Sequence, residues 1–196
     1  MTRKVYCGLL MIELKKIEKD NPDKKILEEI NVEAIPECER NSLDDLIDTG
    51  AVVLGIYFEN RPAGFFVLRE YKFIRYLAYF AVNADLRSKG IGSEALSLLI
   101  KNIKDYQMIV EYENPSTDDP EDINMRRRDF YIRNGFYETG WYTYYDETEF
   151  AIGCSSQSFD VVMFGEFTEY LSKIVSDHIP KPYRKDQAEK RMKYKK

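Results

Sequence analysis

The sequence predicts an α/β (α+β) protein made of one domain over residues 1–180, followed by a basic tail over residues 181–196. Three observations support this expectation. Between residues 52 and 82 the chain is rich in β-branched and aromatic residues, which favour strands. From residue 92 onward, segments with helical and with strand-like hydrophobic spacing alternate. A length of 196 residues with 44% hydrophobic and 32% charged residues suits a soluble globular domain with one core.

The N-terminal part is expected to hold one strand and two short helices. The apolar run Val5–Ile12 is a candidate strand, and its eight residues before Glu13 are too few to cross a bilayer. Lys24–Ile30 has apolar residues at helical spacing. A second helix opens at Ser42 with a capping-box-like pattern and is expected to end at Gly50.

The middle of the chain is expected to form an antiparallel meander of three strands. The turn between the first two strands falls at Glu59–Pro62, where Asn and Pro interrupt the apolar pattern. The expected strands are Val52–Phe58, Gly64–Tyr71 and Phe73–Val82.

The C-terminal half is expected to alternate helices and strands around a Pro- and Asp-rich loop. The first helix has apolar residues at three-and-four spacing and so buries one face on a sheet. The expected segments, in order, are a helix over 92–104, a strand over 108–113, the loop over 114–123, a helix over 124–134, a strand over 136–145, a last strand over Phe159–Phe164 and a last helix over Thr168–Val175.

The cysteines and the one histidine argue against a disulfide framework and against a metal site. Cys7, Cys38 and Cys154 are odd in number, far apart and without a CxxC pair. His178 stands alone near the C-terminus, so triads and metal sites that need several histidines are not expected. A reducing, cytoplasmic location fits this usage best.

Charge is distributed unevenly along the chain. The net charge is −5, but residues 181–196 hold eight Lys or Arg against Asp186 and Glu189, so this tail carries +6 and the rest −11. An acidic body repels phosphates, so neither nucleic acid nor a membrane is an expected partner. The tail itself has two interpretations, a solvated terminus or a contact with an anionic surface.

The most informative segment is a glycine-containing turn that follows the third meander strand. It predicts an anion cradle, because glycines let a backbone approach a ligand and the first amides of a helix have no helical partner. A pyrophosphate fits such a cradle, although a Gly-x-Gly turn can also serve helix–sheet packing alone. Ala95 stands where a dinucleotide fold needs a third glycine. The residues of the cradle are Arg87, Ser88, Lys89, Gly90, Ile91, Gly92 and Ser93.

Two motifs in this sequence resemble those of the GNAT acetyltransferase family. Arg87-x-x-Gly90-x-Gly92 matches the Gln/Arg-x-x-Gly-x-Gly/Ala signature of that family. Downstream, Asn124 and the run Phe130-Tyr131-Ile-Arg-Asn-Gly135-Phe136 resemble its Asn-x6-Tyr-x3-Gly-Phe element. The two motifs occur in the family's order, with a helix and a strand between them, and the resemblance extends over nearly the whole chain.

The resemblance implies a fold and a coenzyme site. The fold would be a mixed, mostly antiparallel sheet that splays between its fourth and fifth strands, with helices on both faces. Acetyl-CoA would be the co-substrate, with no metal. Its pantetheine arm would lie along Phe80, Ala81 and Val82, its pyrophosphate on the amides of Arg87–Ser93, and Asn124 would contact the coenzyme arm or else cap its own helix.

The resemblance also implies a proton donor but no fixed base. Tyr131 would protonate the departing thiolate, or it would be a core aromatic under the last helix. A backbone N–H near Val82 would polarise the thioester carbonyl. Independently of the family, Glu111 and Glu113 lie two apart on one strand and so share a face; either can accept the proton of the attacking amine, or one pairs with an arginine such as Arg75.

The acceptor is less well specified than the coenzyme. The loop 114–123 carries Asp118, Asp119, Glu121 and Asp122, which would form a lid over a cationic acceptor or remain solvated surface. Tyr142, Tyr144 and Tyr145 would line an acceptor pocket or fill a sheet.

The sequence thus favours an acetyl-CoA-dependent N-acetyltransferase acting on a primary amine of an unidentified, cationic acceptor. The alternative is a non-catalytic acyl-CoA-binding or sensing module, which would keep the cradle without turnover. A nucleic-acid-associated protein acting through the tail is disfavoured by the acidic body. A homodimer stays open.

Overall fold

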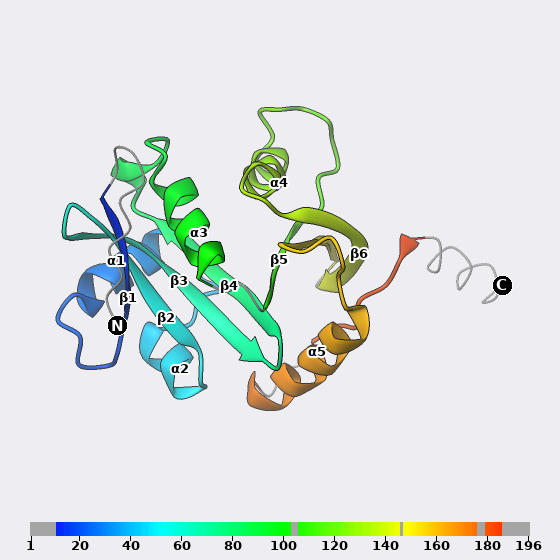
Figure 1. Cartoon of the computed structure of the whole chain (residues 1–196), viewed down its shortest axis with the longest axis horizontal. Helices are drawn as coiled ribbons and strands as arrows, with labels where there is room; N and C mark the ends of the chain where they lie inside the picture. The colour runs from blue at the N-terminus through cyan, green and yellow to red at the C-terminus, as the bar shows by residue number, and fades with distance from the viewer. Residues whose placement is uncertain (1–10, 103–105, 146, 176–178, 186–196) are drawn as a thin grey trace. The chain divides into compact units, whose positions relative to one another are not determined.

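The structure is a computed structural model that describes residues 11–102, 106–145, 147–175 and 179–185. The chain divides into two compact units, residues 1–106 and 107–196 (Figure 1). The expected strand Val5–Ile12 lies outside the described residues except at its end, and the first described strand is β1, Ile12–Lys16. Cys7 and His178 also lie outside the described residues.

The first unit is built on a four-stranded antiparallel sheet in the order β1-β2-β3-β4. The expected meander is confirmed, and Glu59 and Asn60 form its first turn with φ values of 50° and 63°. The elements of this unit are β1 Ile12–Lys16, α1 Lys24–Ala34, α2 Leu43–Asp48, β2 Val52–Phe58, β3 Arg61–Tyr71, β4 Ile74–Val82, the 3₁₀ turn η1 Ala84–Leu86, and α3 Ile91–Lys101.

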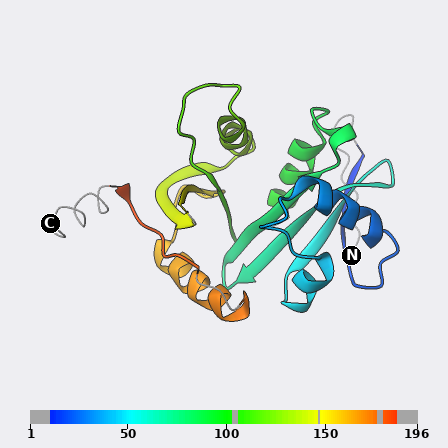
Figure 2. The same cartoon turned by 180° about the vertical axis from the view of Figure 1, so that it is seen from behind.

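Helices cover both faces of this sheet. Figures 1 and 2 show α3 on one face and α1 with α2 on the other. The core on the second face joins Leu27 of α1 and Leu43 of α2 to Val53, Phe65 and Val67 of the strands, all 0–1% exposed. Burying such side chains stabilises the unit by about 1.5–3 kcal/mol each, which fixes both helices on the sheet.

The start of α2 follows a local rule, whereas the end of α1 depends on a tertiary contact. The Ser42 hydroxyl accepts a hydrogen bond from the Asp45 amide at 3.1 Å, so the expected N-cap of α2 is confirmed. In contrast, α1 continues past Ile30 to Ala34. Asn31 is fully buried, and its amide donates to the Asn41 carbonyl at 2.9 Å, a contact that no local pattern reveals.

The second unit is a three-stranded antiparallel sheet with β7 in the middle, paired with β5 on one side and β6 on the other. In Figure 1, α4 and α5 flank this sheet. The elements are β5 Gln107–Glu113, α4 Ile123–Arg133, β6 Tyr137–Tyr145, β7 Thr148–Cys154 and α5 Val161–Val175.

The expectation of a last strand over Phe159–Phe164 is wrong. The last strand is β7, Thr148–Cys154, and the segment from Val161 onward is the start of α5. The Asp160 carboxylate accepts a hydrogen bond from the Met163 amide at 2.9 Å and so opens the helix early. The sequence does not predict β7, because its Gly, Ala and Glu residues have low strand propensity. Pairing with β5 and β6 on both sides outweighs this low propensity.

The start of the basic tail is packed against the second unit. The backbone of Tyr183 exchanges two hydrogen bonds with Tyr142 of β6, at 2.9 and 2.8 Å. Lys181 forms an ion pair with Glu169 of α5 at 2.7 Å. Tyr183 is thus fixed on the second unit, whereas Lys181, Arg184 and Lys185 are exposed, and residues 186–196 of the tail lie outside the described residues. Among the helices of the described ranges, none is long and apolar enough to span a membrane.

Candidate active site

The turn between β4 and α3 has the backbone that an anion cradle needs. Gly90 is the N-cap of α3 with a φ of 81°, a left-handed conformation that glycine adopts without strain. The first bond within the helix runs from the Glu94 amide to the Gly90 carbonyl at 3.0 Å. The amides of Ile91 and Gly92 precede it in the first turn, where N–H groups have no acceptor within the helix.

Two cations belong to the same turn between β4 and α3. Arg87 and Lys89 are exposed. The Arg87 Nε donates to the Val82 carbonyl at 2.9 Å, and the Lys89 Nζ donates to the Asp85 carbonyl at 2.8 Å. These bonds tie both side chains to the loop, where their charges add to the positive end of the α3 dipole. The turn is thus able to hold a pyrophosphate group.

The end of β4 is held close to β3 at a glycine. Val82 lies opposite Gly64, and a Cβ at Gly64 would collide with the carbonyl oxygen of Ala81. Ala81 is buried, and Phe80 packs on Phe66 with ring centroids 4.5 Å apart. The strand expected to carry the pantetheine contacts is therefore fixed in position up to its last residue.

Tyr131 lies in an aromatic cluster of the second unit. Its ring stacks on Tyr112 at a centroid distance of 5.7 Å and meets Phe136 edge-on at 5.4 Å. Only 8% of the residue is exposed, and burial raises the pKa of its phenol to about 12. Tyr131 is thus a buried aromatic that packs on Tyr112 of β5, and its raised pKa keeps the phenol protonated near neutral pH, as a proton donor must be.

Glu113 and Asn124, predicted separately, meet at the start of α4. The Asn124 side-chain amide donates to Glu113 Oε2 at 3.0 Å, and Arg127 lies 3.8 Å from Glu113 Oε1. Asp122, rather than Asn124, caps α4, because its carboxylate accepts from the amides of Asn124 and Met125. The Glu113 carboxylate is thus engaged by an amide and a cation from α4.

Glu111 has a different neighbour. The hydroxyl of Thr143 on β6 donates a hydrogen bond to its carboxylate, and Thr143 is fully buried. The pairing partners Ile152 and Phe150 of β7 stand between the two residues in the sheet. Sequence reasoning missed Thr143, since nothing in the local pattern of β6 distinguishes it and only the strand order brings it to Glu111. Arg75, the arginine considered for such a pairing, instead contacts Glu70 at 3.1 Å.

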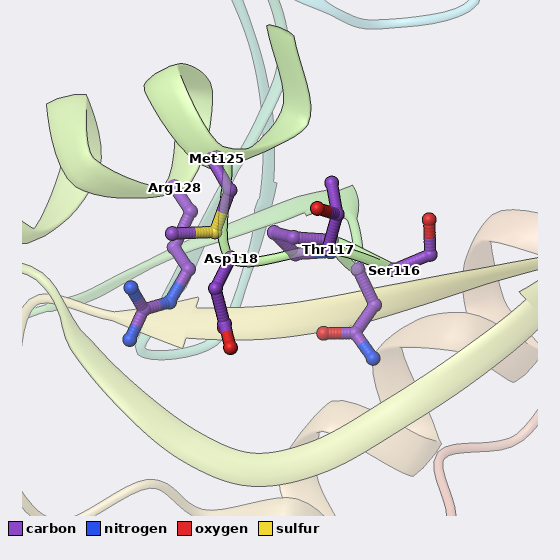
Figure 3. Close-up of a pocket in the computed structure, with 7 residues that line it drawn as sticks. Ser116, Thr117, Asp118, Met125 and Arg128 are labelled. Atoms are coloured by element: carbon purple, nitrogen blue, oxygen red, sulfur yellow. The ribbon is translucent and has the colours of Figure 1, made fainter. Parts of the chain in front are cut away.

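A polar pocket of about 340 Å³ lies between the Pro- and Asp-rich loop and α4. Figure 3 shows Asp118 and Arg128 extending into the same region from the loop and from the helix. Arg128 is fixed there by two bonds to the Glu138 carboxylate, at 2.9 and 2.7 Å, and these raise the pKa of its guanidinium. The lining residues are Asn114, Pro115, Ser116, Thr117, Asp118, Met125 and Arg128.

The acidic loop divides into residues that shape it and one that faces the pocket. The Asp119 carboxylate accepts from the Glu121 amide at 2.9 Å, and Asp122 caps α4. These two carboxylates therefore organise the loop locally, whereas Asp118 lines the pocket.

The three tyrosines of β6 have separate roles. Tyr142 pairs with Tyr183 of the tail, and the Tyr145 ring packs edge-on against Phe150 at 5.5 Å. Tyr144 is 53% exposed. None of the three lines the pocket between the loop and α4 within the part of the chain that the structure describes.

The glycine turn follows β4 in the first unit and Tyr131 follows β5 in the second, which is the order of the two motifs that resemble those of the GNAT family. The chain belongs to the acetyltransferase (GNAT) family, whose model matches residues 16–136. The α/β fold class expected from the sequence is thereby confirmed. No match is found among curated proteins.

Solved structures of this family share the fold. A GNAT-family protein from Bacteroides thetaiotaomicron is 23% identical, with a TM-score of 0.67 over 85% of this chain and 98% of that one. A GNAT acetyltransferase from Elizabethkingia anophelis with acetyl-CoA bound is 17% identical, with a TM-score of 0.53 over 73% and 96%. The ribosomal-protein-S18-alanine N-acetyltransferase of Escherichia coli is 16% identical, with a TM-score of 0.56 over 76% and 96%.

Proposed function

We propose that this protein is an N-acetyltransferase that transfers an acetyl group from acetyl-CoA to a primary amine of a cationic acceptor. The single observation that carries the proposal is the cradle at Gly90, whose left-handed backbone presents the first amides of α3 beside Arg87 and Lys89. Acetyl-CoA bound to the Elizabethkingia anophelis relative supports the choice of coenzyme.

The coenzyme is held by backbone groups of the first unit. The amides of Ile91, Gly92 and Ser93 bind the pyrophosphate, and the field of the α3 dipole with the cations of Arg87 and Lys89 favours its charge. The pantetheine arm lies along Phe80–Val82, and a backbone N–H near Val82 polarises the thioester carbonyl.

The reaction is a single acyl transfer. The neutral amine nitrogen attacks the thioester carbonyl carbon, a C–N bond forms, and the C–S bond breaks with its electrons leaving on sulfur. A carboxylate accepts the proton that the amine nitrogen loses, and the Tyr131 phenol delivers a proton to the departing thiolate. Products are the acetamide and free coenzyme A.

Of the two candidate carboxylates, Glu111 is the proposed base. The carboxylate of Glu113 is bound by Asn124 and approached by Arg127, a cation that neutralises part of its charge. Glu111 accepts a hydrogen bond from the Thr143 hydroxyl of β6, which orients its carboxylate. Glu113 then serves to hold Asn124 in place at the start of α4.

The cationic character of the acceptor rests on charge. Outside the tail the chain carries −11, and Asp118 faces the pocket between the loop and α4. A negative field raises the local concentration of cations, so an amine with additional positive charge is the expected substrate.

Release of free thiol from acetyl-CoA across a panel of amines tests this function. We expect thiol release that depends on the amine and is fastest with polyamine or lysine-like acceptors. Tyr137→Phe is a matched control for Tyr131→Phe, because Tyr137 is a 47% exposed tyrosine of β6 outside the cluster. Coenzyme A binding without thiol release for any amine would favour the non-catalytic acyl-CoA-binding module.

A further inference from the structure

The C-terminal segment Lys181–Lys185, here called the strap, is fastened to the β6–β7 hairpin by contacts of several kinds. Its backbone pairs with β6 through Tyr183 and Tyr142, whose ring centroids are 6.1 Å apart. Arg184 lies over the Trp141 ring at 5.0 Å, and Lys185 lies over the Tyr142 ring at 4.5 Å. The strap is therefore a bound part of the second unit.

Two residues of the strap contact the carboxylate of Glu149 on β7. The Tyr183 hydroxyl donates to Glu149 Oε2 at 2.6 Å, and the Lys185 ammonium lies 3.0 Å from Glu149 Oε1. The Glu149 side chain is 28% exposed. Burial opposes its ionisation, but hydrogen bonds from Tyr183, Lys185 and Asn114 outweigh this effect and lower the pKa of Glu149.

Glu149 in turn holds the first residue of the pocket loop at two points. The Asn114 side-chain amide donates to Glu149 Oε1 at 2.5 Å, and the Asn114 backbone amide donates to the Glu149 carbonyl at 2.8 Å. Asn114 lines the pocket, and Pro115 to Asp118 continue from it along the same wall. A continuous path of hydrogen bonds thus runs from the tail to the pocket.

We propose that Tyr183 is a positioning residue for acceptor binding, which fixes the pocket wall Asn114–Asp118 through Glu149. This inference rests on the proposed function, because it assigns the pocket to the acceptor. A hydrogen bond to a charged group contributes about 1.5–3 kcal/mol, which is enough to set the conformation of a surface loop. The strap acts on the acceptor and leaves the coenzyme cradle, which belongs to the first unit, unchanged.

The test compares Tyr183→Phe, which keeps the ring and the backbone pairing, with Tyr137→Phe. Tyr137 is an exposed tyrosine of β6, the strand with which Tyr183 pairs, and it is not one of the residues that contact the strap. With spermidine as the amine probe, Tyr183→Phe should raise KM ~10-fold, as expected for one such hydrogen bond, with little change in kcat. Coenzyme A affinity measured by calorimetry should stay within twofold, and Tyr137→Phe should behave as wild type.

A double-mutant cycle separates positioning from general stabilisation. Glu149→Gln should raise KM similarly, and the Tyr183→Phe/Glu149→Gln double variant should be no worse than Glu149→Gln alone, because both changes break one path. Truncation after Pro180 should reproduce the effect, and truncation after Lys185 should not. Additive effects, or an equal loss of coenzyme affinity, would overturn the proposal.

If wild type does not acetylate spermidine, that result contradicts the proposed acceptor class alone. Hydrogen exchange then tests the positioning role of Tyr183 without any acetylation assay. The amides of Asn114, Ser116, Thr117 and Asp118 should exchange faster in Tyr183→Phe than in wild type, while those of α3 should not change. Unchanged exchange at Asn114–Asp118 would show that the strap does not position the pocket wall.

Discussion

The hydroxyl of Thr143 on β6 donates a hydrogen bond to the carboxylate of Glu111 on β5, across the intervening strand β7. Thr143 is fully buried, so its hydroxyl depends on this carboxylate rather than on water for a partner. The pair joins the proposed base to a residue that carries no charge of its own. The buried Thr143 hydroxyl thus fixes the orientation of the Glu111 carboxylate, the proposed base.

Thr143→Val should therefore lower kcat at pH 7 by about tenfold, because the variant keeps the shape of the side chain but releases the Glu111 carboxylate. Thr143→Ser, which retains a hydroxyl, should recover much of the loss. The measurement is kcat of the three proteins from steady-state thiol release at pH 7. Equal kcat for Thr143→Val and wild type would show that Glu111 is not the base or that Thr143 does not orient it.

Gly90→Glu should abolish coenzyme A binding while the protein remains folded. The substitution places a side chain at a φ of 81° and a negative charge at the helix terminus where the pyrophosphate binds. Calorimetry on the variant, with circular dichroism to confirm folding, measures the effect. Because left-handed backbone disfavours any side chain, Gly90→Asn is the control, and it should bind more weakly than wild type but better than Gly90→Glu. Unchanged affinity in folded Gly90→Glu would remove the cradle assignment.

Tyr131→Phe should lower turnover by ~10²-fold with coenzyme affinity nearly intact, since general acids contribute on this scale and the aromatic packing is conserved. Steady-state thiol release and calorimetry separate the two quantities. Equal turnover in the variant and wild type would leave Tyr131 as a core aromatic alone.

The pKa of Tyr131, raised by burial to about 12, predicts how activity and stability change in alkali. The phenol should remain a proton donor up to about pH 11, so any decline of kcat at lower pH must arise elsewhere. The neutral form is favoured in the folded state, so its stabilising contribution is complete below about pH 10 and is lost as the pH rises through about 12. Urea unfolding from neutral to alkaline pH should therefore show wild type losing stability relative to Tyr131→Phe only above about pH 10.

The efficiency of acetylation of a cationic amine should fall with salt, because the Debye length shortens from ~10 Å at 0.1 M to ~3 Å at 1 M. Only Asp118 of the acidic loop lines the pocket, so Asp118→Asn should account for most of the loop's share in this dependence. Asp119→Asn should instead loosen the loop through its lost bond to the Glu121 amide. Two results together would contradict this prediction: a neutral amine as the best acceptor, and the same salt dependence for Asp118→Asn and wild type. The acidic loop would then have no part in acceptor specificity.

Local rules explain which parts of the protein were predictable. Strand β2 has the predicted bounds, Val52–Phe58, Ser42 caps α2 as predicted, and the turn before α3 has a left-handed backbone at Gly90. Each of these features depends on interactions within a few residues, such as a cap, a side-chain period or the freedom of a glycine. The first family motif falls on the Gly90 turn.

The sequence by itself determined the meander, the glycine turn before α3 and the family, because each depends on residue spacing over a short range. Only the tertiary structure decided that β7 lies between β5 and β6, that Thr143 meets Glu111, and that Tyr183 reaches Glu149. Pairs such as these lie more than 30 residues apart, and their meeting depends on the order of strands in the sheet. Strand order depends on the burial of whole sheet faces, to which every residue of a strand contributes. The sequence around either member of such a pair therefore does not reveal its partner.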